Sequence, residues 1–376
     1  MYKRQYIGGL RNHRPLVERK RIADKLLSIK KELKKQGVPE RNVSESLLLG
    51  SFNIRDFDSN KFGHGKRLRE SYYYLAEMIS AFDLVALQEV NENLAGLKKL
   101  MEHLGRNWEY ISTDTSGNKE RMVFVFDTCK VQFRNIAGEI VLPHKRLNRK
   151  EFDEFAKSVR GLDDKEFRKV AAEREALNPN RQFDRTPFIV SFQSGWFKFK
   201  ICTVHLYYGA SSGIKLERRK REIREVAKFL KKRADKDDQN HYILLGDFNI
   251  VSPEHETMKA LTNNGFTVPD ELQKGNVKET MYYDQIAFRL KDEALVPKAA
   301  NVFTFFKSVF KDSEFETYKP SMKKISSKAK SLTDEALKKY YKNEWRTFQI
   351  SDHKLMWVEL KIDFSEQYLK DRKSDT

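Results

Sequence analysis

The sequence has few of the features that stabilise or anchor specialised chains. Its 376 residues include only two cysteines, nine prolines and 17 glycines. Two cysteines exclude a disulfide-dense scaffold, and so little proline and glycine excludes collagen-like or linker-dominated chains. No window approaches 18 uninterrupted apolar residues, and the first residues contain no apolar stretch of the secretory type. We therefore expect an intracellular, cytoplasmic protein without a membrane span.

The two cysteines are Cys129 and Cys202. Each lies in a strand-like apolar run, and neither belongs to a spacing typical of metal sites. We expect both to be buried thiols.

Apolar residues and positive charge are abundant. Hydrophobic residues make up 39% of the chain and aromatic residues 12%, which is enough for a substantial core and excludes global disorder. The formal net charge is +18 at pH 7. A field of this sign favours polyanionic partners such as nucleic acid, anionic lipid or phosphorylated substrates, and it carries no information about the fold.

Short apolar runs of strand length alternate with helical patterns along the chain. The expected strands are 47–54, 84–87, 121–126, 131–141, 187–193, 196–204, 242–246, 284–288 and 355–360. The expected helices are 66–82, 93–104 and 215–234. This alternation predicts an α/β protein with layered sheets covered by helices.

The composition divides the chain into a central domain with additions. We expect a basic helical extension over 1–45, a main domain over 46–363 and a charged tail over 364–376. Two segments near 144–184 and 300–346 interrupt the strand pattern and are interpreted as insertions. The second begins with several phenylalanines, which favour packing over the stacking of bases.

The N-terminal extension carries 13 Lys/Arg against five acidic residues. Ile22, Leu26, Ile29 and Leu33 recur at helical spacing, which predicts an amphipathic helix. Three interpretations remain open. The helix packs on the main domain, contacts nucleic acid with its basic face, or lies on a membrane surface, and the first two are compatible.

A short internal echo links two distant strands. Residues 48–54 (LLGSFNI) match residues 244–250 (LLGDFNI) at six of seven positions. Either the match is a coincidence, or two related halves each deliver an asparagine from the C-terminal end of a strand. Strand ends that face a shared crevice are where ligands bind in such folds.

Polar residues follow several of the buried strands, and their order resembles that of the endonuclease/exonuclease/phosphatase superfamily, whose best-known member is pancreatic-type deoxyribonuclease. Eight motifs occur in the family's order between residues 47 and 361: SFN, LQEV, KER, RTPF, TVHL, GDFN, YDQI and SDH. The resemblance implies a four-layer α/β sandwich, with two central mixed sheets packed face to face and helices outside. It also implies Mg²⁺-assisted hydrolysis of a phosphoester, with Mn²⁺ as a substitute ion.

The resemblance assigns roles to the oxygen-bearing side chains. Glu89 matches the principal metal ligand, and Mg²⁺ prefers hard carboxylate oxygens. Asn53 matches a residue that positions the water shell of the metal or the phosphate. Asp247 matches one that positions the attacking water or shares the metal. Asn249 would donate to a phosphate oxygen, and Asp352 would complete the metal and water environment.

Two histidines lie at family positions, His205 and His353. An imidazole has a pKa near neutrality, so it exchanges protons at working pH. The resemblance implies two carboxylate–imidazole pairs, Asp284 with His353 and Glu120 with His205. Whether His353 or Asp247 is the general base stays open.

Arg185 in the RTPF motif matches an arginine that contacts substrate phosphate in the deoxyribonuclease branch. A planar guanidinium can bind two phosphate oxygens at once. Asn118 departs from the family pattern, because that branch has an aromatic residue there that packs against the sugar. The departure puts the mode of groove contact in doubt but leaves the hydrolysis unaffected.

The charge distribution bears on the substrate. Residues 215–236 carry 11 Lys/Arg against four acidic residues, so they and the N-terminal extension hold most of the net charge. Concentrated positive charge is typical of proteins that bind a nucleic-acid backbone. We therefore expect an intracellular DNA nuclease. The alternatives are a lipid or inositol-phosphate phosphatase and a nuclease that acts on RNA.

Overall fold

The computed structural model describes residues 6–13, 15–143, 149–178, 180–273, 282–291 and 297–374. The strands are β1 Ser46–Phe57, β2 Leu84–Asn91, β3 Trp108–Ser112, β4 Glu120–Asp127, β5 Gln132–Glu139, β6 Phe188–Ser194, β7 Phe197–His205, β8 His241–Asp247, β9 Asp284–Arg289, β10 Ala299–Phe303 and β11 Leu355–Lys361. The α-helices are α1 Leu16–Lys35, α2 Arg69–Ile79, α3 Ala95–Leu104, α4 Arg149–Ser158, α5 Asp164–Leu177, α6 Gly213–Ala234, α7 Glu256–Thr262, α8 Phe315–Ile325, α9 Asp334–Tyr340, α10 Arg346–Gln349 and α11 Ser365–Ser374.

The described strands form two mixed sheets. The first has the order β10-β11-β1-β2-β4-β3, and the second has the order β5-β6-β7-β8-β9. Each sheet contains one parallel pair, β1 with β2 and β7 with β8, and the other neighbours are antiparallel. Each copy of the sequence echo, in β1 or β8, lies on one strand of the parallel pair of its sheet.

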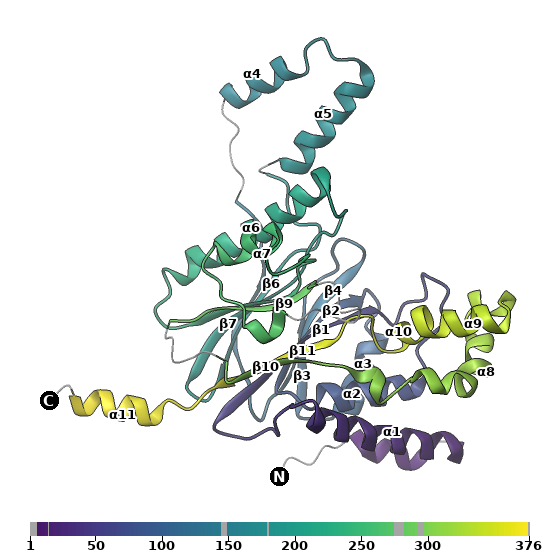
Figure 1. Cartoon of the computed structure of the whole chain (residues 1–376). Helices are drawn as coiled ribbons and strands as arrows, with labels where there is room; N and C mark the ends of the chain where they lie inside the picture. Colours follow the sequence, from purple (N-terminus) through teal and green to yellow (C-terminus); the bar gives the residue numbers. More distant parts are fainter. Residues whose placement is uncertain are drawn as a thin grey trace.

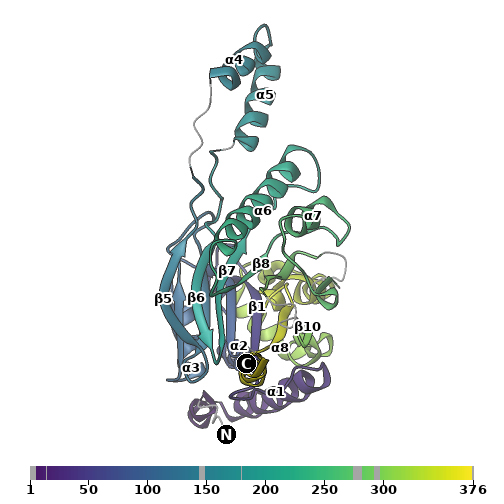
Figure 2. The same cartoon turned by 90° about the vertical axis from the view of Figure 1, so that its left-hand side faces the viewer.

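The two sheets pack face to face around a core that both supply. Leu49 of β1, Phe124 of β4 and Leu245 of β8 belong to this core and are fully buried. Alternate residues of β1 point the other way, so Leu48 and Phe52 pack under the outer helices. Helices α1, α2 and α3 cover the first sheet, and α6 and α7 cover the second (Figures 1 and 2). The expected four-layer α/β sandwich is confirmed.

The N-terminal helix is part of this packing. Ile22, Leu26, Ile29 and Leu33 of α1 are all buried in the core that underlies the first sheet. On the adjacent faces, Arg21 pairs with Glu70 of α2 at 2.7 Å. The packing interpretation of residues 16–35 is confirmed.

The first predicted insertion forms helices α4 and α5, which project from the body of the molecule (Figures 1 and 2). Residues 144–148 and 179 of this segment lie outside the described residues. Contacts between α5 and α6 and an ion pair of Asp184 with Arg218 hold the base of this arm against the second sheet's outer layer.

The second predicted insertion forms β10 at its start and then α8, α9 and α10. Phe303, Phe305 and Phe310 are at most 1% exposed, so they pack in the core and are not available to stack on bases. Strand β10 was not predicted, and it makes residues 299–303 an edge of the first sheet instead of part of an insertion.

Three further features differ from the sequence expectation or extend it. Cys202 is buried as expected, but Cys129 is exposed, because the apolar run of β4 ends before it and Cys129 lies in the turn towards β5. Strand β3, at 108–112, was not predicted. Among the described residues, no helix combines the length and apolar character needed to cross a membrane.

Candidate active site

The strand directions bring the predicted polar residues to one edge of the sandwich. His205 and Asp247 are the last residues of the parallel strands β7 and β8 and are register partners. Asn53 and Glu89 lie near the ends of the parallel strands β1 and β2, where the register shifts. Because the carboxyl ends of parallel strands share an edge, each sheet contributes two side chains to the same place.

The antiparallel neighbours contribute from their beginnings, which lie at that same edge. Glu120 is the first residue of β4, Asp284 is the first residue of β9, and His353 comes two residues before β11. The sheet topology thus brings side chains that are spread over about 300 residues of sequence into one cluster.

Asn53 connects the two sheets within this cluster. Its fully buried side chain donates from Nδ2 to Glu89 Oε1 at 2.9 Å and to Asp247 Oδ2 at 3.2 Å. Its Oδ1 accepts from the backbone N–H of Arg55 at 3.0 Å. The amide therefore fixes the separation of one carboxylate from each sheet.

Glu89 is held in a defined orientation. Its Oε2 accepts from the backbone N–H of Asp56 at 2.7 Å, and its side chain remains 20% exposed. The φ of Glu89 is +61°, in the left-handed region that a glutamate rarely adopts. Strained backbone of this kind persists only where the surrounding structure holds it in place, and it is concentrated at functional sites.

His205 lies between three carboxylates. Its Nδ1 is 2.9 Å from Glu120, and its Nε2 is 3.8 Å from both Glu89 Oε1 and Asp247 Oδ2. Burial lowers the pKa of His205 most strongly, but the carboxylates of Glu120, Asp247 and Glu89 together outweigh it, and the pKa is raised overall. For Glu120, burial raises the pKa, while His205 and Arg185 together bring it down to about 2.

His353 has a similar arrangement on the other side of Asp247. Its Nδ1 donates to Asp284 Oδ2 at 2.7 Å, and its Nε2 is 3.8 Å from Asp247 Oδ2. Burial lowers the pKa of His353, but the adjacent Asp284 carboxylate reverses this and raises the pKa well above its usual value. One oxygen of Asp247 thus lies equally far from the Nε2 atoms of both histidines.

Three of the predicted site residues make protein contacts of their own. Arg185 donates from Nε to Glu120 Oε2 at 2.8 Å, and Asn249 donates from Nδ2 to the carbonyl oxygen of Leu206 at 2.9 Å. Asp352 is 39% exposed and pairs with Arg55 at 3.3 Å. Its Oδ1 lies 4.0 Å from the Nε2 of His353, so it is at the margin of the cluster.

The sequence interpretation missed a buried arginine behind the site. Arg67 donates to the carbonyl oxygens of Ile54, Arg55 and Asp56, at 2.6, 2.8 and 3.3 Å. Arg55 and Asp56 have φ values of +45°, so the guanidinium holds together the irregular turn that orients Glu89. A lone arginine in a basic loop gives no sequence signal for this role.

The donor set fits a hard divalent cation. Among the described residues, neither Glu89 nor Asp247 forms an ion pair with a lysine or arginine, although Asn53 holds both carboxylates in one place. Asp247, Asp284 and His353 also offer ligand atoms within 4.8 Å of one another. Carboxylate oxygens are the ligands that Mg²⁺ prefers.

Several solved structures align with this chain over most of its length. An endonuclease/exonuclease/phosphatase family protein from Bacteroides thetaiotaomicron aligns with a TM-score of 0.50 and 16% identity, over 85% of this chain and 99% of that one. A mannosyl-6-phosphatase from the same organism aligns at 0.49 and 17% identity, over 84% and 99%. D. rerio TDP2 in complex with a single-strand DNA product aligns at 0.48 and 14%, over 84% and 98%.

No protein-family model matches the sequence, and neither does any curated protein. The chain nevertheless has the fold of the endonuclease/exonuclease/phosphatase superfamily, so the resemblance carried by the eight motifs is confirmed at the level of the fold.

Proposed function

We propose that this protein is a Mg²⁺-dependent phosphodiesterase that hydrolyses the backbone of DNA by in-line attack of water. One observation carries the proposal. Asp247 lies between two imidazoles, each oriented by its own carboxylate, while Asn53 holds Glu89 beside it. Hydrolysis of an anionic diester requires a water to be oriented, protons to be moved and negative charge to be balanced.

Glu89 and Asp247 would hold the metal ion, with Asn53 fixing their separation and Asp352 adding a carboxylate from the margin. Bound there, Mg²⁺ or Mn²⁺ would supply positive charge to balance the phosphate oxygens and would favour deprotonation of the attacking water.

The chain's own residues organise the proton transfers. Each histidine turns Nδ1 to a carboxylate, so Nε2 is the atom presented to Asp247. Asp247 orients the attacking water, one imidazole accepts its proton, and the other protonates the leaving oxygen. Glu120 and Asp284 fix the tautomer and the ring orientation of their partners.

Arg185 and Asn249 would bind the oxygens of the substrate phosphate. Arg185 is bonded through Nε to Glu120, which aligns the guanidinium with the His205 side of the site. The choice of a polynucleotide over a small phosphate ester depends on the net charge of +18, since a small ester does not require so large a positive field.

The first experiment is a substrate panel with Mg²⁺, with and without EDTA. We expect nicking of supercoiled plasmid and cleavage of oligonucleotides only when the metal is present. The panel also contains RNA, inositol phosphates and bis(p-nitrophenyl) phosphate. Phosphate release from inositol phosphates without cleavage of any polynucleotide would contradict the DNA assignment.

The second experiment separates the roles of the site residues. Glu89→Gln should lose activity that high Mg²⁺ partly restores, because the change weakens an ion ligand. His205→Ala and His353→Ala should each lower kcat by a factor of about 10² to 10⁴. The histidine that protonates the leaving oxygen is the one whose loss is small for a p-nitrophenolate leaving group. Equal losses for good and poor leaving groups in both variants would contradict the acid–base scheme.

A further inference from the structure

A groove between α6 and α7, outside the catalytic cluster, is lined mainly by basic side chains and has a volume of about 450 Å³. Four cations line it: Lys220, Arg224 and Lys228 from α6 and Lys259 from α7. The lining also includes Asn263, Asn264 and one acidic residue, Glu256. We call this feature the α6–α7 groove.

The three α6 residues recur every four positions, so they lie on one face of the helix with a rise of about 6 Å from each to the next. Lys220 has acidic partners, since its Nζ lies 2.7 Å from Glu217 and also bonds Glu256. Arg224, Lys228 and Lys259 are exposed, and the described residues place no carboxylate within ion-pair distance of them. The groove therefore carries positive charge that the protein itself does not neutralise.

The groove adjoins the catalytic cluster through α6. Arg219, next to Lys220, is buried and donates to the carbonyl oxygens of Asn249 and Tyr208. Asn249 follows Asp247 by two residues, and its backbone N–H donates to Asp247 Oδ1 at 3.0 Å. The first half of α6 is thus anchored to the segment that contains Asp247, and the row of cations begins at the residue after Arg219.

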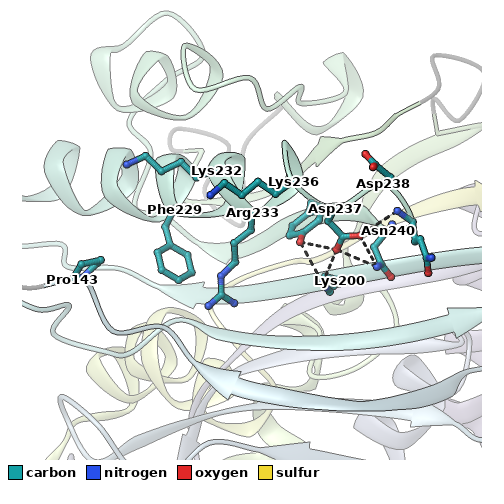
Figure 3. Close-up of a pocket in the computed structure, with 11 residues that line it drawn as sticks. Pro143, Lys200, Phe229, Lys232, Arg233, Lys236, Asp237, Asp238 and Asn240 are labelled. Atoms are coloured by element: carbon teal, nitrogen blue, oxygen red, sulfur yellow. Dashed lines mark hydrogen bonds and ion pairs between the residues drawn. The ribbon is translucent and has the colours of Figure 1, made fainter.

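A second pocket at the far end of α6 differs in its charge. It is lined by Lys200, Lys232, Arg233 and Lys236, but it also contains Asp237 and Asp238 (Figure 3). Asp237 accepts from Lys200 and from the hydroxyl of Tyr242 within that pocket. Since this pocket lies where β7 and β8 begin, it is at the edge of the sheet opposite the catalytic cluster.

We propose that the α6–α7 groove binds the phosphate backbone of a polynucleotide strand whose scissile phosphate occupies the catalytic cluster. This inference rests on the proposed function and adds a second binding segment to it. A row of cations at regular spacing suits the repeated charges of a strand, whereas one small ester would occupy only the catalytic cluster. A membrane surface suits it poorly, because no large apolar side chain of α6 or α7 is exposed.

The test compares a charge-reversal pair on the groove face of α6 with a control pair at the C-terminal end of that helix. The groove pair is Arg224→Glu with Lys228→Glu, and the control pair is Lys232→Glu with Lys236→Glu. Both pairs change the net charge equally, and thermal unfolding checks that each variant is folded. Binding of a fluorescent 20-nucleotide single strand is measured between 50 and 300 mM salt, in EDTA to prevent cleavage.

We expect the groove pair to weaken binding at least about tenfold and to reduce the slope of log K against log salt by about 1.4, since each lost phosphate contact removes about 0.7. The ratio of kcat/KM for the oligonucleotide to that for bis(p-nitrophenyl) phosphate should fall in the groove pair and stay unchanged in the control pair. Equal weakening by both pairs would overturn the proposal, because it would show general attraction by net charge.

Anionic vesicles provide the other arm of the test. Loss of vesicle binding in the groove pair, with oligonucleotide binding intact, would overturn the proposal in favour of a lipid surface. Failure of the proposed function has a different signature. Groove-dependent binding of the oligonucleotide without hydrolysis of any ester supports the groove and refutes the catalytic assignment.

Discussion

Gly246 allows a stringent test of how the catalytic edge is built. It immediately precedes Asp247 and pairs in register with Val204, and its φ is +125°. A Cβ added there would lie 2.1 Å from the carbonyl oxygen of Val204 and 2.9 Å from its backbone nitrogen. Backbone atoms cannot give way by rotating, so Gly246→Ala must push β7 and β8 apart beside the pair His205–Asp247.

The sequence echo supplies the matched control, because Gly50 of β1 holds the equivalent position in the other sheet. A Cβ there would lie 3.2 Å from a methyl group of Val85, which requires a shift of only a few tenths of an ångström. Its φ is outside the left-handed region. Reduced freedom of the unfolded chain offsets part of the cost of Gly50→Ala, by about 0.4–1 kcal/mol.

The two substitutions should therefore differ clearly. For Gly246→Ala, the unfavourable backbone conformation costs about 1–3 kcal/mol, and one or two weakened strand hydrogen bonds cost about 1 kcal/mol each. We expect a loss of about 3 kcal/mol, against about 1 kcal/mol or less for Gly50→Ala. Chemical denaturation measures both. Displacement of the catalytic carboxylate by about 1 Å should also reduce kcat about 100-fold in Gly246→Ala. Equal destabilisation of the two variants would refute the reasoning.

Three further predictions concern His64, Arg67 and the two cysteines. Burial, together with the positive charges of Lys328 and Arg55, lowers the pKa of His64 to about 4. Between pH 6.5 and 4 the imidazole is therefore protonated in the unfolded chain but neutral in the folded chain. Stability should fall by up to about 3 kcal/mol between pH 6.5 and 4, and His64→Asn should reduce this loss in urea titrations. Arg67→Met should destabilise by about 2–4 kcal/mol and reduce Mg²⁺ affinity, because three carbonyl oxygens lose their donor. In the native protein a thiol reagent should label Cys129 and leave Cys202 unlabelled until the protein unfolds.

Each of these expectations has an outcome that contradicts it. A pH dependence that is identical in wild type and His64→Asn would assign the acid loss to other groups. Unchanged Mg²⁺ affinity in a folded Arg67→Met variant would limit that arginine to a packing role. Labelling of two thiols per native chain would contradict the burial of Cys202.

The central strands could be predicted because burial on both faces leaves an unbroken apolar run, as in 242–246 and 84–87. The edge strands β3 and β10 could not, since residues such as Glu109 and Asn301 interrupt the apolar pattern on their more exposed faces. Cys129 was misassigned because an apolar neighbourhood in sequence does not show where a strand turns.

The grouping of the candidate site residues was predicted from motif order, which placed Glu120 and His205 together although 85 positions separate them. The supporting contacts could not be found in this way. Arg67 binds backbone carbonyls and Asn53 bridges the two sheets, and both arrangements exist only after the chain has folded. Sequence order identifies chemical groups, whereas their separation depends on tertiary packing.

The helical arm of α4 and α5 offers a place where the chain can be divided into two fragments. A backbone cut at Gly161, an exposed residue between the two helices, would leave one chain with Asn53, Glu89 and Glu120. The other chain would hold both histidines and Asp247. Neither fragment could assemble the pocket alone, but the two could reassociate through their apolar sheets, so the arm is a natural place to convert this protein into a two-component reporter of association.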